Sequence, residues 1–158
     1  EEPYSIAMTL LETLGPKASQ AKVIATDIDT EALAKARKGI YPQEQVRKLD
    51  EARVKRFFQK GTGNHIGLAR VRPEVSALVE FMPLNLLAPQ WPVKGPFDAV
   101  FCRNIMIYFD KDTQAKILKR FAPLMKPDGL LFAGHSENFS YISDAFKLRG
   151  QTVYTLAK

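Results

Sequence analysis

The stretch Phe97–Phe109, FDAVFCRNIMIYF, decides the fold. Within it, Ala99–Cys102 is a short unbroken apolar run, which predicts a strand buried on both faces of a parallel sheet. Arg103 and Asn104 follow at the expected C-terminal end of this strand. Because ligands bind outside the carboxyl ends of strands in open α/β sheets, the pair is a candidate site. An ordinary solvated turn is the alternative, but Tyr108, a polar-tipped aromatic residue in an otherwise apolar segment, favours a site.

The composition is that of an ordinary globular protein. The 158 residues correspond to one domain by length, with 46% hydrophobic and 25% charged residues. No apolar run approaches the roughly 20 residues that span a bilayer, so we expect a soluble protein without membrane insertion. Cys102 is the single cysteine, which excludes a disulfide framework and a cysteine zinc site. We therefore expect a reducing, cytoplasmic setting.

The net charge is positive, at +6, from 23 basic and 17 acidic residues. This balance favours an acidic partner, although a basic surface that only promotes solubility is an equal alternative. The chain has no zinc-finger spacing, no aromatic RNA-binding motif and no dense block of Lys and Arg. We therefore expect no nucleic-acid partner.

The N-terminal segment predicts a helix. Glu1 and Glu2 precede Pro3, and acidic residues before a proline suit the positive end of a helix. Gly15 and the proline after it predict the end of this helix. Helical spacing predicts one apolar face, formed by Ile6, Leu10 and Leu14.

The next strand ends in a carboxylate. Lys22–Asp27 predicts a buried strand, and Thr30 is expected to cap the helix that follows. In dinucleotide-type folds an acidic side chain at this place accepts hydrogen bonds from ribose hydroxyl groups. Asp27 is the better candidate, because Asp29 serves equally well to start the next helix.

The middle of the chain changes its pattern. Two charged helical pieces, 42–49 and 50–58, are followed by glycine-rich sequence and by period-two alternation that includes Val75–Pro83. This predicts a small antiparallel insert at about 57–83. Gly61-Thr-Gly63 lacks the strand and helix that flank a phosphate loop, so we interpret it as a hairpin turn. A free edge of such an insert is suited to binding a peptide by strand addition.

The remaining elements complete an α/β pattern. Asn85 and Leu86 follow a strand, and His135 lies in a polar loop after the buried strand 130–133, where a general base is one interpretation. The other predicted elements are a proline-rich loop at 87–96 in which Trp91 packs, an amphipathic helix at 111–124 and a closing hairpin at 146–156. This order predicts a three-layer α/β sheet with an antiparallel edge.

Three motifs carry a resemblance to a known family. They are Ala25–Thr30 (ATDIDT), Phe101–Phe109 (FCRNIMIYF) and Lys126–Phe139 (KPDGLLFAGHSENF). The sequence resembles the chemotaxis receptor methyltransferases of the CheR type along essentially its whole length. Enzymes of that type use S-adenosylmethionine to methylate glutamate side chains of bacterial chemoreceptors and release S-adenosylhomocysteine.

The resemblance implies a fold and a set of site residues. It implies a Rossmann-like class I methyltransferase domain over 1–158, with an antiparallel C-terminal hairpin and a β-subdomain at about 57–83. The family's first strand, glycine loop and N-terminal catalytic arginine have no counterpart here, so we expect a C-terminal part of such an enzyme. Tyr108 is implied to lie close to the reacting methyl group. The implied cofactor-binding residues are Glu2, Asp27, Asn85, Leu86, Arg103 and Asn104.

The resemblance also implies partners, and two other functions compete with it. In some members of the family the β-subdomain binds a peptide at the C-terminus of the receptor, so the implied partner is the cytoplasmic part of chemoreceptors. A nicotinamide-dependent oxidoreductase would use the same acidic strand end, but its second mononucleotide half is not evident in the sequence. A non-catalytic receptor-binding fragment is the second alternative.

Overall fold

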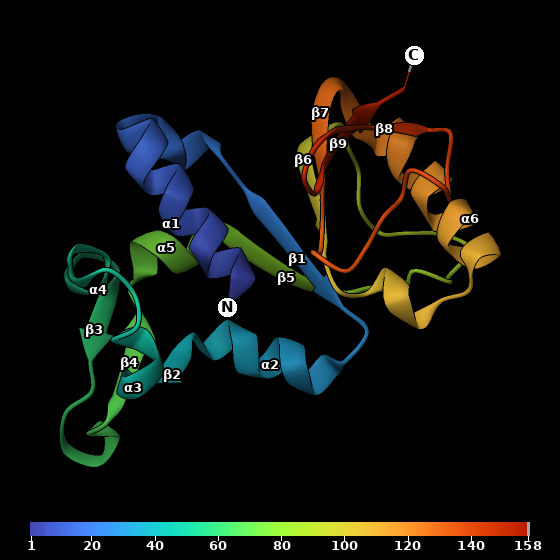
Figure 1. Ribbon diagram of the computed structural model, residues 1–158. Coiled ribbons are helices and arrows are strands. Elements are labelled where there is room, and N and C mark those ends of the chain that lie inside the picture. The colour runs from blue at the N-terminus through green and yellow to red at the C-terminus, as the bar shows by residue number, and fades with distance from the viewer. Residues whose placement is uncertain (158) are drawn as a thin grey trace. The chain divides into compact units, whose positions relative to one another are not determined.

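The computed structural model describes residues 1–157. They form two compact units, of which the first is Glu1–Asn85 and the second begins at Leu86. Each unit has a hydrophobic core of its own. The fold is a mixed α/β arrangement with parallel and antiparallel strand pairs, which agrees with the predicted fold class at that level (Figure 1).

The first unit contains a parallel strand pair, an antiparallel sheet and the helices that pack on them. Its elements are α1 (Glu2–Leu14), η1 (Gly15–Gln20), β1 (Val23–Asp27), α2 (Thr30–Lys38), β2 (Ile40–Pro42), α3 (Gln43–Val46), α4 (Glu51–Phe57), β3 (Phe58–Lys60), η2 (Gly63–His65), β4 (Leu68–Val71), α5 (Pro73–Ser76) and β5 (Val79–Pro83). β1 pairs with β5 in parallel, and β4 lies between β2 and β3.

Helix α1 lies alongside β1 and β5 (Figure 1). It begins and ends where the sequence predicts, but its buried face is different. Tyr4, Ala7 and Met8 are buried, whereas Ile6 is half-buried and Leu14 is exposed. Both sets of residues satisfy helical spacing, so the packing partners, and not the spacing, select the face.

The antiparallel sheet confirms a hairpin around the glycine-rich segment. β3 and β4 pair in antiparallel and are joined by the segment that contains Gly61 and η2. The prediction that Val75–Pro83 belongs to the antiparallel piece is wrong, because β5 pairs in parallel with β1. Helix α5 lies between β4 and β5, so the chain leaves the antiparallel sheet before β5 begins. Alternation indicates which face of a strand is covered and does not give the direction of its neighbour.

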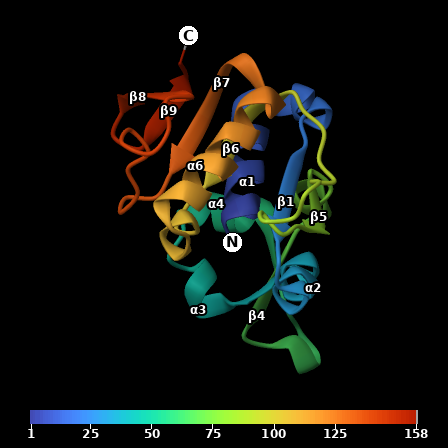
Figure 2. The ribbon, with the colours of Figure 1, turned by 90° about the vertical axis from the view of Figure 1, so that its right-hand side faces the viewer.

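The second unit is a four-stranded sheet with one long helix against it. Its elements are β6 (Phe97–Cys102), η3 (Met106–Tyr108), α6 (Lys111–Phe121), η4 (Ala122–Leu124), β7 (Met125–Ala133), β8 (Phe146–Gly150) and β9 (Val153–Leu156). The strand order is β6-β7-β9-β8. β6 and β7 are parallel, whereas β9 is antiparallel to β7 and to β8, which confirms the closing hairpin (Figure 2).

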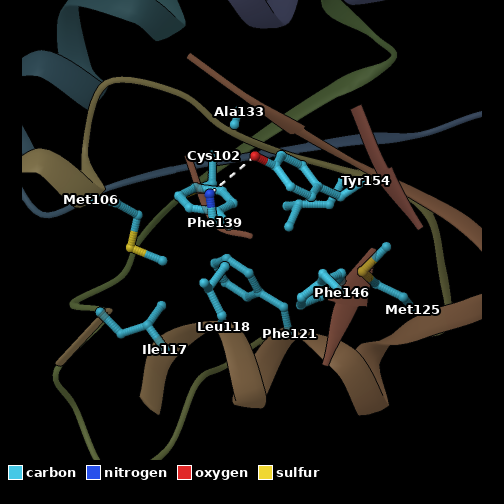
Figure 3. Close-up of a cluster of buried hydrophobic side chains, with 11 residues drawn as sticks. Cys102, Met106, Ile117, Leu118, Phe121, Met125, Ala133, Phe139, Phe146 and Tyr154 are labelled. Atoms are coloured by element: carbon cyan, nitrogen blue, oxygen red, sulfur yellow. Dashed lines mark hydrogen bonds between the residues drawn. The ribbon is translucent and has the colours of Figure 1, made fainter. Parts of the chain in front are cut away.

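The core of this unit lies between α6 and the sheet. Leu118 and Phe121 extend from α6 toward Tyr154 of β9 and Phe139 of the loop after β7 (Figure 3). The Tyr154 hydroxyl group accepts a hydrogen bond from the backbone N–H of Phe139 at 3.0 Å, so this loop is fixed to the core. Asp110 caps α6, because its carboxylate accepts a hydrogen bond from the backbone N–H of Thr113 at 2.7 Å.

The two strands that organise the site are less buried than predicted. In β6 only Cys102 is buried, and Phe101 is 39% exposed. In β1 no residue is buried. The apolar runs therefore predicted both strands correctly, but they did not predict how far the residues of these strands are buried. Burial also depends on which segments pack against a strand, and the run itself does not encode them.

Candidate functional site

The first group of predicted site residues lies at the carboxyl end of the parallel pair β1–β5. Asp27 is the last residue of β1 and lies opposite Pro83, the last residue of β5. The backbone N–H of Leu84 donates to the Asp27 carbonyl oxygen at 3.0 Å, and Asn85 follows directly. Asp27 and Asn85 thus lie at the same end of one sheet, where the sequence predicts a ligand site.

The two aspartates after β1 have different roles. Asp29 caps α2, because its Oδ1 accepts hydrogen bonds from the backbone N–H groups of Glu31 at 2.9 Å and Ala32 at 3.3 Å. The prediction that Thr30 is the cap is wrong by one residue, since Thr30 is already helical. Asp27 is exposed, and its Oδ2 has no partner within residues 1–157. Asp27 is therefore the carboxylate that is available to a ligand.

Glu2 lies in the first turn of α1 and is half-buried. Its turn is fixed by Tyr4, whose hydroxyl group donates to the Ala36 carbonyl oxygen of α2. The Tyr4 ring also contacts Phe81 of β5, with ring centroids 5.8 Å apart. The first turn of α1 is therefore held against both α2 and β5, and the position of Glu2 is defined.

The second group lies at the carboxyl end of β6. Arg103 is half-buried and Asn104 is exposed. Asn104 has a φ of 62°, a left-handed conformation that side-chain-bearing residues seldom adopt and that asparagine tolerates best. The chain therefore turns sharply at the predicted site.

A buried carboxylate, which the sequence analysis missed, holds this turn. Glu137 is 8% exposed, and its Oε1 accepts hydrogen bonds from the backbone N–H groups of Asn104 at 2.9 Å and Gly134 at 2.8 Å. Its Oε2 accepts a hydrogen bond from the Met106 backbone N–H at 3.0 Å. The sequence shows only a polar loop here, and the glycine at the end of the preceding strand is the one local sign of a close approach.

Tyr108 ends η3 and is 80% exposed. Ile105 and Ile107 are also exposed, and within this short segment only Met106 belongs to the core. The apolar character of this segment in the sequence therefore corresponds to burial only at Met106. The exposure of Tyr108 leaves its ring and hydroxyl group accessible.

The backbone of Leu86 is fixed by side chains from the same unit. Its carbonyl oxygen accepts hydrogen bonds from Trp91 Nε1 and Arg120 Nη1, both at 3.3 Å. The Arg120 guanidinium group also lies over the Trp91 ring, 3.9 Å from its centroid, and Trp91 contacts Phe121. Trp91 is thus a packing residue, as predicted.

The structure brings the predicted residues together within each unit. Asp27 and Asn85 lie at one strand end of the first unit, whereas Arg103 and Asn104 directly follow β6 in the second. His135 is exposed in the loop after β7, and nothing in the described part of the chain marks it as a base. Among residues 1–157 no group of three potential ligands is placed to hold a metal ion. No helix in the same range is long and apolar enough to cross a membrane.

The comparison with protein families decides the assignment. Residues 1–155 match the family described as "CheR methyltransferase, SAM binding domain". The chain belongs to the CheR methyltransferase family. SAM is S-adenosylmethionine, so this part of a CheR protein binds S-adenosylmethionine as its cofactor, as the sequence motifs imply.

Curated CheR relatives match throughout the chain. It is 63% identical over 158 residues to "Chemotaxis protein methyltransferase" of Escherichia coli (strain K12), which covers 100% of this chain and 55% of the relative. It is 52% identical over 157 residues to "Chemotaxis protein methyltransferase 2" of Pseudomonas aeruginosa, and this alignment covers 99% of this chain and 56% of the relative. The chain thus spans about half the length of the curated relatives that it matches.

One solved structure is similar at a lower level. "A Pericyclic Reaction enzyme" aligns with a TM-score of 0.44 and 17% identity, covering 95% of this chain and 46% of that one. A likeness of this size carries no argument about the CheR chain.

The site residues fit S-adenosylmethionine in their chemistry. The ribose of this cofactor carries hydroxyl groups, and the Asp27 carboxylate has one oxygen engaged by Asp29 and the other available to accept from them. Asn85 beside it carries both an amide donor and a carbonyl acceptor, which suits the polar edges of an adenine ring. Both residue types therefore suit a nucleoside, and Asp27 Oδ2 is an acceptor that is available to one.

Proposed function

We propose that the full-length protein transfers a methyl group from S-adenosylmethionine to glutamate side chains of bacterial chemoreceptors. The products are glutamyl methyl esters, formed in chemotactic adaptation, and S-adenosylhomocysteine. The observation that carries this proposal is the match of residues 1–155 to the CheR family. The printed names of the relatives, "Chemotaxis protein methyltransferase", support the same activity.

The chemistry explains why the chain needs no strong general base. The reference pKa of a glutamate carboxyl group is about 4.3, so the substrate side chain is already ionised at neutral pH. One carboxylate oxygen attacks the methyl carbon, the C–S bond breaks, and its electron pair remains on sulfur. The attack joins opposite charges and neutralises both. The protein therefore has to align the two groups and exclude water, which contributes about 7–11 kcal/mol in favourable cases.

We assign a role to each predicted residue. Glu2 and Asp27 hold the ribose hydroxyl groups, and Tyr108 lies near the transferred methyl group. The adenine and methionine parts of the cofactor are positioned by the remaining site residues, Asn85, Leu86, Arg103 and Asn104. The exposure of Asp27, Asn104 and Tyr108 supports these roles, since each must reach a ligand.

The fold that we propose for the domain is a Rossmann-like class I methyltransferase sheet with an antiparallel C-terminal hairpin. The parallel pairs β1–β5 and β6–β7 and the antiparallel strands β9 and β8 support it.

We further propose that the antiparallel sheet β2-β4-β3 is a receptor-docking subdomain. Its strands β3 and β4 lie in the region predicted as an insert at about 57–83, whereas β2 precedes that region. Arg70 lies on the central strand β4, opposite Ile40 of β2 and Gln59 of β3, and is exposed. Arg72 directly follows β4 and is also exposed. Two exposed cations beside edge strands suit a peptide that adds to the sheet, such as the C-terminal peptide of a receptor.

The test uses the full-length protein in two assays. Isothermal titration compares S-adenosylmethionine with NADH, and a transfer assay counts base-labile methyl groups on a purified cytoplasmic receptor fragment. We expect the protein to bind S-adenosylmethionine and not NADH. We also expect labelled methyl groups on receptor glutamates. Tight binding of NADH without S-adenosylmethionine would favour an oxidoreductase. Receptor capture without any methyl ester would favour the non-catalytic binding function.

A further inference from the structure

We propose that Glu137 is a positioning residue for cofactor binding: its buried carboxylate fixes the turn at Asn104 against the end of β7. This inference rests on the proposed function, because it assumes that the end of β6 contacts S-adenosylmethionine. It adds a residue that acts through the backbone and need not touch the cofactor.

The hydrogen bonds of Glu137 join two segments that are distant in sequence. Two of the three donors, the backbone N–H groups of Asn104 and Met106, follow β6, and the third, that of Gly134, follows β7. All three distances lie between 2.8 and 3.0 Å. Hydrogen bonds to an ionised acceptor are about twice as strong as neutral ones. A carboxylate that is 8% exposed is tolerated because backbone groups satisfy both of its oxygens.

The local backbone needs such an anchor. Asn104 is held at a φ of 62°, which is unfavourable for a residue with a side chain. Gly134 permits the close approach of the two strand ends, because a β-carbon there would collide with Asn104 Oδ1 and would lie 3.0 Å from Glu137 Oε1. The carboxylate therefore fixes the backbone of Asn104, while Gly134 leaves room for its side chain.

The segment 104–106, which Glu137 holds through the Asn104 and Met106 backbone N–H groups, lies between two residues with assigned roles, Arg103 at the cofactor and Tyr108 near the methyl group. Arg103 directly precedes Asn104, and Tyr108 ends the single turn η3 that begins at Met106. The backbone N–H of Tyr108 donates to the Ile105 carbonyl oxygen at 3.1 Å, which connects Tyr108 to the segment that Glu137 holds. A displacement of Glu137 would therefore move both ends of the segment.

Glu137→Gln in the full-length protein is the direct test. Glutamine keeps the shape of the side chain but exchanges one acceptor oxygen for an amide NH2 donor, so three backbone N–H groups face a single acceptor oxygen. We expect the Kd and KM for S-adenosylmethionine to rise about tenfold or more, because a hydrogen bond to a charged group is lost at the turn. Calorimetric titration gives Kd, and a melting curve without cofactor gives the effect on stability.

Tyr154→Phe is the matched control for stability. It removes the acceptor for the Phe139 backbone N–H in the same loop and removes no atom from the three hydrogen bonds of Glu137. We expect it to lower the melting temperature and to leave the Kd for S-adenosylmethionine within about twofold of wild type, because the hydroxyl group that it removes accepts from Phe139, whereas Glu137 accepts from three other backbone N–H groups.

A second pair of variants keeps the carboxylate. Gly134→Ala places a methyl group against Asn104 and Glu137, whereas Gly150→Ala adds the same group to β8 where no atom lies within 4 Å. We expect Gly134→Ala to raise the Kd for S-adenosylmethionine and Gly150→Ala to leave this Kd unchanged. If Glu137→Gln fails to fold, this pair decides.

The outcomes separate the two proposals. If Glu137→Gln and Gly134→Ala both bind S-adenosylmethionine with the Kd of the wild-type protein, the proposed role of Glu137 is wrong. It is also wrong if Tyr154→Phe reproduces the loss of affinity at equal loss of stability, because the carboxylate would then be structural only. A wild-type protein that does not bind S-adenosylmethionine would overturn the proposed function.

Discussion

The carboxylate of Asp27 accepts a hydrogen bond from the backbone N–H of Asp29, at 3.0 Å from Oδ1. This bond fixes the Asp27 side chain at the end of β1 and leaves Oδ2 available. Asp29 is itself engaged in capping α2. The two aspartates, of which the sequence favours Asp27 as the ligand contact, thus have separate tasks in the structure.

Asp27→Asn should weaken the binding of S-adenosylmethionine by about 1.5–3 kcal/mol, the range for a hydrogen bond to a charged group. In a calorimetric titration of the full-length protein, this corresponds to a Kd raised about 10- to 150-fold. Asp29→Asn is the matched control, because it makes the same charge change two residues away and asparagine caps helices as well as aspartate. Equal losses in the two variants would show that charge, and not contact, lowers the affinity.

Tyr108→Phe should reduce turnover and leave cofactor affinity and stability almost unchanged. The side chain is 80% exposed, so the ring makes little contribution to packing. If its hydroxyl group orients the glutamate or the sulfonium in the transition state, kcat should fall about 10- to 100-fold. The assay counts base-labile methyl esters on a receptor fragment.

Tyr141→Phe is the control for the change at Tyr108, since Tyr141 is 90% exposed in the same unit. It should leave kcat unchanged. A Tyr108→Phe protein with normal kcat would remove the hydroxyl group from the reaction.

Neutralising Arg70 and Arg72 to glutamine should weaken receptor capture about tenfold, with the Kd for S-adenosylmethionine unchanged. The physical reason is the loss of two exposed cations beside the antiparallel sheet. Surface plasmon resonance on an immobilised receptor peptide measures capture. Lys35→Gln with Lys38→Gln removes the same charge from exposed positions on α2 and should change neither quantity. A fall in cofactor affinity as large as the fall in capture would contradict a separate docking role.

Stability at alkaline pH should depend on Tyr41. This residue lines a cavity of about 280 Å³ in the first unit. Burial, followed by the charges of Tyr4 and Glu1, raises its pKa from 10.0 to about 12. A raised pKa means that the folded state favours the protonated form, so this contribution is present below pH 10 and is lost as the pH rises toward 12.

Tyr41→Phe should therefore reduce the loss of stability between pH 10 and 12. Urea unfolding of the full-length protein at several pH values measures it, with Tyr141→Phe as a matched control for an exposed ring. The same pH slope in wild type and Tyr41→Phe would show that the phenol does not titrate differently in the folded state.

The strands and the long helices were predictable because their signals are local. Apolar runs predicted β1, β6 and the 130–133 part of β7, and helical spacing predicted α1 and α6. β7 already begins at Met125, so the predicted strand was too short at its start. Burial was not predictable from the same runs, since it depends on packing partners elsewhere in the chain. For this reason β6 was correct as a strand and wrong as a strand buried on both faces.

The candidate site was predictable in its strand ends but not in its supports. Asp27 and Asn85 follow strands, which a local pattern reveals. Glu137 acts through backbone N–H groups after two different strands, and their convergence depends on the turn at Asn104. No spacing in the sequence encodes such a convergence, so a buried carboxylate was read as part of a polar loop.

The partial cover of β6 has a practical consequence for protein production. Within the described residues β6 pairs with β7 alone, and the exposed Phe101 stacks on Phe132 with ring centroids 4.3 Å apart. A strand that is paired on one side only is a template on which other chains add as extra strands. When residues 1–158 are expressed by themselves, we therefore expect association that increases with concentration and ends in precipitation. Purification at low concentration should reduce these losses.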